Sequence, residues 1–176
     1  MTIEDIRLRL ADAYWVIPDK FLAGPYPRGW QDEVIIKKID TLLEADITLF
    51  INLTELGESP SYAELLYQRA EIYGKDVVHW NASIIDWGTT TIKHMIEILD
   101  KIDESLENDK HVYVHCLGGI GRTGTVVGCY LVRHGMQADN ALRQIAEWRK
   151  DIPAGRMRSP ENDDQRNMIL NWQVGQ

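Results

Sequence analysis

The sequence predicts an α/β protein in which helices flank a mostly parallel central sheet. Short apolar runs of strand length alternate with helical patterns from Trp30 to His115, and this alternation is typical of parallel sheets covered on both faces. From Thr123 onward only helical patterns remain. A length of 176 residues corresponds to one domain, so we expect residues 1–176 to form a single unit.

Each element follows from the spacing of its apolar residues. A charged helix is expected at the N-terminus, and the first two strands should pair as a small hairpin. The expected strands are 14–17, 21–23, 48–53, 77–80 and 111–115. The expected helices are 30–45, 62–72, 92–106, 125–134 and 138–150, followed by a last helix that Ser159 would cap, with Pro160 at its first position.

Composition excludes several classes of protein. The formal charge of −8 argues against a protein that binds nucleic acid by covering phosphates. No uncharged stretch approaches the ~18 apolar residues of a membrane span, and the N-terminus carries charges where a signal peptide would be apolar. We therefore expect a cytoplasmic protein without membrane contact. The five histidines show no ligand spacing, so no metal site is expected.

The segment from His115 to Gly124 (HCLGGIGRTG) joins the last predicted strand to a helix. Its glycines let successive backbone N–H groups turn inward, and the positive end of the helix dipole adds to them. Such a loop forms a cradle for an anion such as phosphate, at the strand ends where α/β sheets bind their ligands. The predicted fold thus includes a cysteine-containing phosphate-binding loop between the last strand and the following helix.

Three side chains of this loop suit nucleophilic attack on a phosphate monoester. Cys116 lies in the positive field of the cradle, which favours thiolate over thiol. Arg122 offers a planar fork that matches two phosphate oxygens, and Thr123 places a hydroxyl near the sulfur. The arrangement indicates in-line attack of sulfur on phosphorus, with the transferred charge held by backbone N–H groups and Arg122.

The run His-Cys-x5-Arg-Thr, here His115 to Thr123, resembles the signature of the cysteine-dependent protein tyrosine and dual-specificity phosphatases. It is most similar to the branch that contains the cyclin-dependent-kinase-associated phosphatase, and the likeness extends from about Thr48 through Arg166. The resemblance implies a covalent cysteinyl-phosphate intermediate and a mechanism without metal or cofactor. It also implies a general-acid Asp on a mobile loop upstream of the cysteine.

Asp86 lies thirty residues before Cys116, which matches the family's acid position. Independently, a departing alkoxide or phenoxide needs a proton donor, and a carboxyl on a glycine-containing loop at this sheet edge is the natural one. Related loops usually carry a proline beside or shortly after the Asp, whereas residues 87–90 here contain none. By the same resemblance, Gln165 orients the water of the second step and His115 holds the loop by hydrogen bonds.

These observations give one set of candidate site residues. The candidate catalytic residues are Cys116, Arg122, Asp86, Thr123 and Gln165, and the candidate substrate-binding residues are His115, Leu117, Gly118, Gly119, Ile120, Gly121 and Arg122.

Several features have a simpler interpretation. Cys116 could be a buried thiol, and residues 119–124 spell the G-x-G-x-x-G of dinucleotide-binding proteins, although no strand ending in an acidic residue follows. Asp86 could cap the next helix, a role that residues 89–91 fill better. Cys129 is expected to pack in the core, with a disulfide to Cys116 under oxidation as the alternative.

The expected pocket rim contains aromatic and basic side chains. Trp87 either stacks on a substrate ring or plugs its loop onto the core, and Trp87 or Tyr26 would contact the ring of a phosphotyrosine. Arg28, Arg156 and Arg158 either line the rim or lie on a solvated face. The surrounding segments are short, which predicts a shallow pocket.

The sequence therefore predicts a metal-independent phosphatase for phosphotyrosine that also accepts phosphoserine and phosphothreonine. Its substrate would be a phosphorylated protein or a small phosphate monoester, and no oligomeric state is predicted. One alternative is a catalytically weak phosphopeptide-binding module that uses the same cradle. The other is an inositol-phosphate or phosphoinositide phosphatase, which the apolar Leu117 and Ile120 disfavour.

Overall fold

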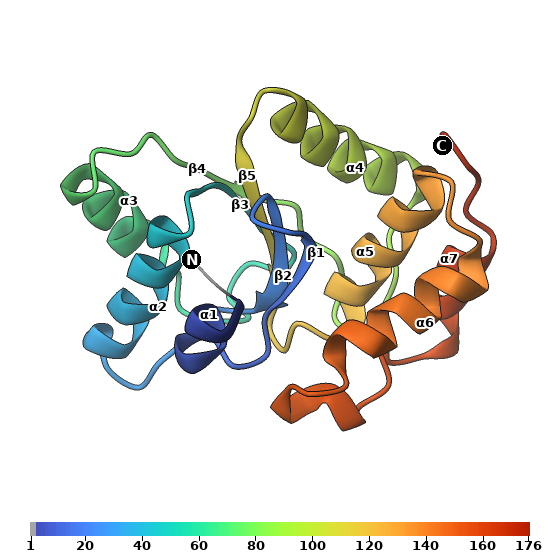
Figure 1. The fold of residues 1–176 in the computed structure, drawn as a ribbon, viewed down its shortest axis with the longest axis horizontal. Coiled ribbons are helices and arrows are strands. Elements are labelled where there is room, and N and C mark those ends of the chain that lie inside the picture. The colour runs from blue at the N-terminus through green and yellow to red at the C-terminus, as the bar shows by residue number, and fades with distance from the viewer. Residues whose placement is uncertain (1–2) are drawn as a thin grey trace.

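A five-stranded sheet forms the centre of the computed structural model, which describes residues 3–176 (Figure 1). The strands are β1 (Tyr14–Ile17), β2 (Phe21–Pro25), β3 (Ile47–Asn52), β4 (Val78–Asn81) and β5 (His111–Cys116). Their order is β1-β2-β5-β3-β4. Strands β1 and β2 pair antiparallel as the expected hairpin, and every other neighbouring pair is parallel. The predicted α/β class is confirmed.

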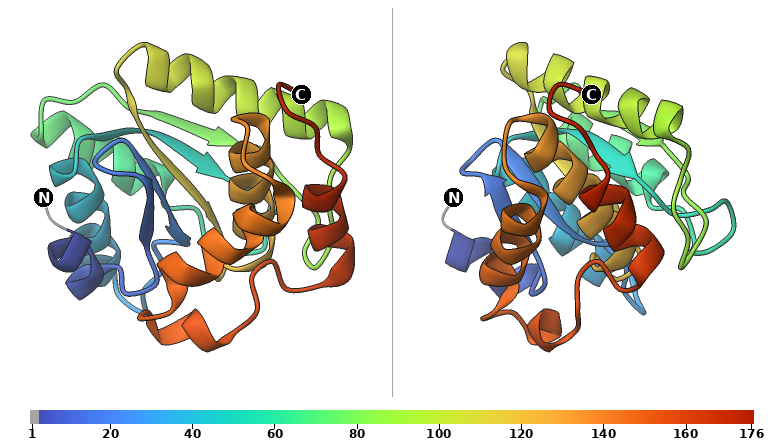
Figure 2. Two further views of the ribbon diagram at one scale, coloured as in Figure 1. Left: turned by 45° about the vertical axis from the view of Figure 1, so that its right-hand side comes forward. Right: turned by 90° about the vertical axis from the view of Figure 1, so that its right-hand side faces the viewer.

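Helices cover both faces of this sheet (Figures 1 and 2). One face carries α1 (Ile3–Arg9), α2 (Asp32–Glu44) and α3 (Ala63–Ile72). The other carries α4 (Ile92–Glu107), α5 (Gly121–Arg133), α6 (Ala138–Arg149) and α7 (Asp163–Leu170), with a short 3-10 helix, η1 (Pro153–Arg156), between the last two. The sheet is therefore the middle layer of three.

The alternation of side chains along β5 divides the core in two. Val112 and Val114 face the α4–α7 side, whereas Tyr113 faces the α1–α3 side, as the two-residue period of a strand requires. All three side chains are fully buried. Because β5 lies between β2 and β3, the residues that follow it are held at the centre of the sheet edge.

The start of the last helix differs from the prediction. Helix α7 begins at Asp163 and its cap is Asn162, whose side chain accepts a hydrogen bond of 2.9 Å from the backbone N–H of Gln165. Ser159 does not cap it, because its hydroxyl donates to the carbonyl of Ile120 over 2.7 Å. The expected Ser159–Pro160 helix start is therefore wrong.

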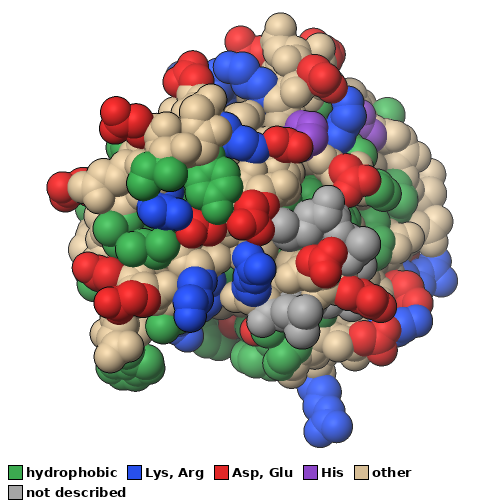
Figure 3. Space-filling model, turned by 60° about the vertical axis from the view of Figure 1, so that its left-hand side comes forward, with side chains coloured by type: hydrophobic (Ala, Val, Ile, Leu, Met, Phe, Trp, Pro, Cys, Tyr) green, Lys and Arg blue, Asp and Glu red, His purple; other side chains and the backbone are tan. Residues whose placement is uncertain are grey.

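The surface shows no single dominant charge on the face drawn in Figure 3, where acidic and basic side chains are interspersed. Within residues 3–176, none of the helices has both the length and the apolar character needed to cross a membrane.

Candidate active site

The predicted phosphate-binding loop lies at the carboxyl end of the central strand. Cys116 ends β5 opposite Pro25 of β2, and the preceding His115 lies opposite Asn52 of β3. Helix α5 begins at Gly121, so its positive end adjoins the loop. The strand–loop–helix arrangement that the sequence predicted is present.

One glycine fixes the path of this loop. Gly119 has a φ of +70°, and a Cβ added there would lie 2.5 Å from the backbone carbon of Gly24. Only glycine meets both conditions without strain. The carbonyl of Leu117 also accepts a hydrogen bond of 3.1 Å from the backbone N–H of Tyr26. The loop is therefore fastened to the segment that follows β2.

A cavity of about 240 Å³ opens above the loop. It is lined by Arg28, Asp86, Trp87, Cys116, Leu117, Gly118, Ile120, Gly121, Arg122, Met157 and Glu161. Most of the predicted residues are thus brought together around one space. Four of them do not line it and lie buried behind the wall: His115, Gly119, Thr123 and Gln165.

Arg122 is almost completely buried and is fixed in place by Glu58. Its two terminal nitrogens donate to the two carboxylate oxygens of Glu58 over 2.7 and 2.5 Å. One of them also donates to the carbonyl of Ile84 over 3.2 Å. The hydrogen bonds from Arg122 are the main cause that lowers the pKa of Glu58, so this carboxylate stays charged and the guanidinium keeps its orientation.

Asp86 points its carboxylate at the same guanidinium. Its Oδ1 lies 2.9 Å from Nη2 of Arg122, and its backbone N–H donates to Glu55 over 3.1 Å. Asp86 does not cap the following helix, because the Thr91 hydroxyl accepts the hydrogen bond from the N–H of His94. The carboxyl is therefore available to the cavity, where its side chain is 46% exposed.

Two side chains from the segment before and within α7 hold the Asp86 loop. Asn162 donates to the carbonyl of Trp87 over 2.7 Å, and Gln165 donates to the carbonyl of Gly88 over 3.0 Å. Trp87 itself has a φ of +58° and is exposed at the cavity, so it does not plug its loop onto the core. These two hydrogen bonds fix the path of the loop, whose residues 87–90 contain no proline.

The contacts of Gln165 differ from the expected role at a catalytic water. Its side-chain oxygen accepts from the N–H of Glu161 over 3.0 Å, and its side-chain nitrogen donates to the carbonyl of Gly88. Both ends of the amide are therefore occupied. Gln165 is fully buried. It connects the acid loop to the segment before α7, which is a positioning role.

His115 supports the loop from below. Its Nε2 lies 2.7 Å from the hydroxyl of Tyr62, and both side chains are buried. Burial lowers the pKa of His115 to about 3, so the ring is neutral at ordinary pH. His115 does not line the cavity, and the hydrogen bond of its ring goes to Tyr62 of the neighbouring layer, so it packs beneath the loop.

The two remaining predicted groups are buried. The hydroxyl of Thr123 has no hydrogen-bond partner among the described residues. Cys129 is a free thiol packed in the core, and its burial raises its pKa. The interpretation of Cys129 as a packing residue is supported.

Three residues of the site were not among the candidates: Glu58, Glu161 and Met157. Glu161 is half-buried, and burial, followed by the charge of Asp86, raises its pKa. Its carboxylate lies against Gly121, where an added Cβ would be 2.1 Å from Oε2. Glu161 could have been found from the sequence, because it lies four residues before the candidate Gln165. Glu58 could not, because its spacing from the other site residues follows no pattern.

The rim differs in part from the expectation. Arg28 lines the cavity, but Arg156 and Arg158 line a separate groove. Tyr26 is buried and its hydroxyl donates to the carbonyl of Pro60 over 3.0 Å. Only Trp87 of the two aromatic candidates is therefore placed to meet a substrate ring. Within residues 3–176, no three His, Cys, Asp or Glu side chains gather as a metal site requires.

The fold and the cysteine-centred anion cradle together define a phosphatase domain of the protein-tyrosine and dual-specificity class. The family model described as PTP-SAK, "Swiss Army Knife protein, DSP-PTPase phosphatase domain", matches residues 12–166. The chain belongs to this family, which confirms the resemblance seen in the sequence.

Known proteins agree with this assignment. The dual specificity protein phosphatase CDC14B of Mus musculus is 26% identical over 131 residues, which cover 70% of this chain and 24% of that protein. The chain thus spans about a quarter of the length of this curated relative.

Solved structures share the fold. Tk-PTP in its active form has a TM-score of 0.70 at 22% identity, covering 92% of this chain and 96% of that one. Kinase associated phosphatase (KAP), with its catalytic-site cysteine replaced by serine, has a TM-score of 0.65 at 18% identity and covers 90% of each chain. PTPMT1 in complex with PI(5)P has a TM-score of 0.68 at 18% identity, covering 92% and 94%.

Proposed function

We propose that this chain hydrolyses phosphate monoesters through a cysteinyl-phosphate intermediate. The observation that carries the proposal is the pairing of Cys116 with Arg122 in one cavity, with the guanidinium of Arg122 held by Glu58 before any ligand binds. A cation that is already oriented at the N-terminus of a helix stabilises the negative charge of a phosphoryl group while it is transferred. Membership of the phosphatase family supports the same reaction.

In the first step, the Cys116 sulfur forms a bond to phosphorus while the ester P–O bond breaks. The leaving oxygen takes a proton from Asp86, whose carboxyl shares the cavity. The ion pair between Asp86 and Arg122 must open for this. The arriving phosphate provides the reason, because its oxygens compete with the Asp86 carboxylate for Arg122.

In the second step, water attacks the phosphorus of the intermediate. The P–S bond breaks, the sulfur leaves as a thiolate, and Asp86, now ionised, takes the proton of the water. Gln165 acts indirectly, because it fixes the Asp86 loop through Gly88. The hydroxyl of Thr123 has no hydrogen-bond partner within the described residues, and we propose that it turns toward the departing thiolate and stabilises it.

We propose phosphorylated proteins as the substrate class, with phosphotyrosine ahead of phosphoserine and phosphothreonine. The phenolic oxygen is the better leaving group, and the exposed Trp87 at the cavity can contact its ring. The cavity volume of about 240 Å³ and its short walls support access for all three side chains.

The structural likeness to PTPMT1, crystallised with PI(5)P, makes phosphoinositides the second candidate. The cavity lining argues against multiply phosphorylated rings, because its two arginines, Arg28 and Arg122, are matched by two carboxylates, Asp86 and Glu161. A second phosphate would meet Asp86 or Glu161 and be repelled. A phosphopeptide-binding module without turnover is the third candidate, and it needs Cys116 and Arg122 but not Asp86.

Turnover of an aryl phosphate by wild type and by Cys116→Ser tests the proposal. Serine keeps the cradle but is not ionised at neutral pH, so the variant should lose turnover and keep its affinity for vanadate. Cys129→Ala is the matched control, because it changes the other, buried thiol and should stay active. Hydrolysis by Cys116→Ser above background would refute the covalent mechanism.

Two further variants separate the candidates. Arg122→Lys should be nearly as damaging as Cys116→Ser, because the two-pronged fork is lost. A panel of phosphopeptides and inositol phosphates, compared by kcat/KM, would then identify the preferred substrate class. The cytoplasmic location and the independence from metal stay predictions, and insensitivity of turnover to EDTA is the measurement for the latter.

A further inference from the structure

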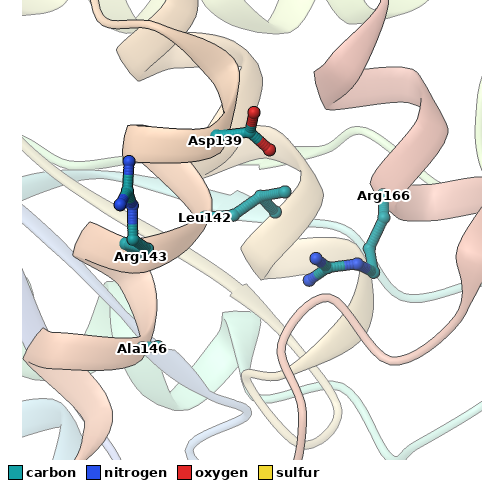
Figure 4. Close-up of a pocket in the computed structure, with 5 residues that line it drawn as sticks. All are labelled: Asp139, Leu142, Arg143, Ala146 and Arg166. Atoms are coloured by element: carbon teal, nitrogen blue, oxygen red, sulfur yellow. The ribbon is translucent and has the colours of Figure 1, made fainter.

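A second concave surface lies between α6, η1 and α7, beside the candidate active site. One part, about 500 Å³ in volume, lies between α6 and α7, where Arg166 reaches from α7 toward Leu142 (Figure 4). The other part, about 200 Å³, shares Arg166 and Leu142 with it and continues along η1. We name this surface the arginine groove and define it by Arg143, Arg156, Arg158 and Arg166 over a floor of Leu142 and Ala146.

The charge of the arginine groove is opposite to that of the whole chain, which has 27 acidic and 19 basic residues. Of its four arginines, Arg158 pairs with Asp163 and Arg143 bonds the side chain of Asn140. Among the described residues, Arg156 and Arg166 form no ion pair with any carboxylate. Asp139 is the acidic residue in the lining. Among the described residues, the lining of the groove therefore holds more arginines than carboxylates, which leaves it with a positive excess.

One residue connects the arginine groove to the catalytic cavity. Met157 lines both the 240 Å³ cavity above Cys116 and the part of the groove along η1. Its carbonyl accepts a hydrogen bond of 3.4 Å from the buried Arg149, which also donates to Ala154 over 3.1 Å. The segment between the two spaces is thus fixed, and an extended ligand can pass over Met157 from one space into the other.

We propose that the arginine groove binds an acidic segment of the same phosphorylated protein whose phosphoresidue enters the cavity. The inference rests on the proposed function and narrows its substrate class to phosphoresidues that have carboxylates nearby in the chain. Arginine forks match carboxylates, and Leu142 and Ala146 suit the aliphatic stems of glutamate. Helix α6 has 12 residues and is therefore ~18 Å long, a span that about six extended residues cover.

A membrane surface fits the groove less well than a peptide. The groove is concave, and Asp139 lies in its lining. A flat anionic bilayer would leave the floor at Leu142 and Ala146 uncovered and bring lipid phosphates close to Asp139. An extended peptide can place its carboxylates on Arg156 and Arg166 and direct a polar or basic residue at Asp139.

The test compares two phosphotyrosine peptides that differ only in charge. One carries glutamates three to eight positions from the phosphotyrosine on both sides, and the other carries glutamines there. We expect kcat/KM of wild type to be about tenfold higher for the acidic peptide, because a few exposed arginine–carboxylate pairs each contribute modestly. In Arg143→Glu/Arg166→Glu this ratio should fall to about one, whereas kcat/KM for a small aryl phosphate should stay unchanged.

The control is Lys93→Glu, which reverses an exposed charge on α4, where the side chain is 89% exposed. This variant should keep the wild-type preference. Equal kcat/KM for the two peptides in wild type, or a preference that survives the double reversal, would overturn the proposal. So would a groove-dependent affinity for anionic lipid vesicles without any peptide preference. Thermal melting of each variant checks that it is folded.

A binding measurement separates this inference from the proposed function. Cys116→Ser, labelled peptides and fluorescence anisotropy report affinity without turnover, and the same glutamate and glutamine peptides without phosphate report the groove alone. If the enzyme is inactive on every phosphoester yet prefers the glutamate peptide through Arg166, the proposed function fails and the groove stands. If the enzyme is active but shows no preference for the glutamate peptide, the proposed function stands and the inference about the groove fails.

Discussion

Arg122 makes its bonds before any phosphate arrives. Glu58 occupies both terminal nitrogens, the carbonyl of Ile84 accepts from one of them, and Asp86 pairs with the other. A buried guanidinium without these partners would be costly, so Glu58 is needed for the fold as well as for the site. The geometry of the cation is therefore set by the protein, and the ligand only has to replace Asp86.

Asp86→Asn should lower kcat on a poor leaving group, such as an alkyl phosphate, by about a hundredfold to ten-thousandfold, which is the usual contribution of a placed general acid. On an activated aryl ester the loss should be much smaller, since that oxygen departs without a proton. Steady-state kinetics on both esters measure the difference. Equal losses on the two esters would show that the proton comes from another group.

Glu161→Gln should tighten the binding of an anion in the cradle. Burial and then Asp86 raise the pKa of Glu161, so at low pH it is neutral and as the pH rises it becomes a charge that repels the anion. Sulfate, which stays a dianion throughout, should therefore bind wild type more weakly as the pH rises. At pH 7 the variant should bind it about fivefold more tightly, which corresponds to about 1 kcal/mol of repulsion.

The affinity for sulfate is measured by calorimetry from pH 5 to 7.5. Inhibition of turnover is not used, because the proteins compared are inactive. Both the parent protein and the Glu161→Gln variant carry Cys116→Ser, so that the two differ only at position 161. The variant should show a flatter dependence on pH than its parent. Parallel curves for the two proteins would place the titrating group elsewhere.

At the scale of the elements, Gly119 tests how the loop is built. Gly119→Ala adds a Cβ at a φ of +70° and 2.5 Å from the Gly24 backbone, so the loop must move. Activity should fall at least ~100-fold, because a misplacement of about 1 Å at a catalytic group has this effect. Gly74→Ala is the matched control: its φ is +62° and nothing lies within 4 Å of the added Cβ. It should lose about 1 kcal/mol of stability and keep activity.

The sequence predicts elements well where apolar spacing is regular and poorly where polar side chains have alternative partners. Strand β5 and helix α4 follow their apolar patterns to within about one residue. The start of α7 was misplaced because a serine and a proline are typical of a helix start, yet the hydroxyl of Ser159 is used by the phosphate-binding loop. Local preference gave way to a tertiary hydrogen bond.

The site shows the same division. Cys116, Arg122 and the neighbouring glycines were predictable because their spacing within one loop carries the chemistry. Glu58 lies 64 positions from Arg122 in the chain and has no spacing rule that connects them. Glu161 and Met157 reach the cavity through an irregular segment whose path depends on the buried Arg149. These residues require the folded chain.

At the scale of the whole molecule, one buried and one half-buried histidine predict acid sensitivity. Burial lowers the pKa of His79 and, to about 3, that of His115. Unfolding releases both rings to take up a proton near pH 6.5, so their contribution to stability is complete above that pH and is lost as the pH falls. Through His115 the free energy of unfolding should fall by about 1.4 kcal/mol per pH unit below ~6 until the folded-state pKa of about 3 is reached, and His79 should add to this loss.

Urea unfolding at pH 7 and at pH 5.2 measures this loss. The window lies above the range in which most carboxylates titrate, and His79→Gln should reduce the difference. If that variant does not fold, the C2 proton shift of His115 in the native wild type gives a second reading. It should stay that of a neutral ring at pH 5, and a protonated ring there would contradict the prediction.

The separation of Cys116 from Asp86 has a consequence for how such a chain can change. The nucleophile ends the central strand, where exchange of backbone amides with solvent should require near-complete unfolding, whereas the acid lies on a loop held from outside by Asn162 and Gln165. Substitutions at the exposed Asp86 and Trp87 should lower turnover at less cost to the fold than substitutions at those buried or capping anchors, and they would leave a stable reader of phosphoresidues. The opposite change, in which the cradle is lost and the acid is kept, would unfold the protein, because the cradle is part of the core.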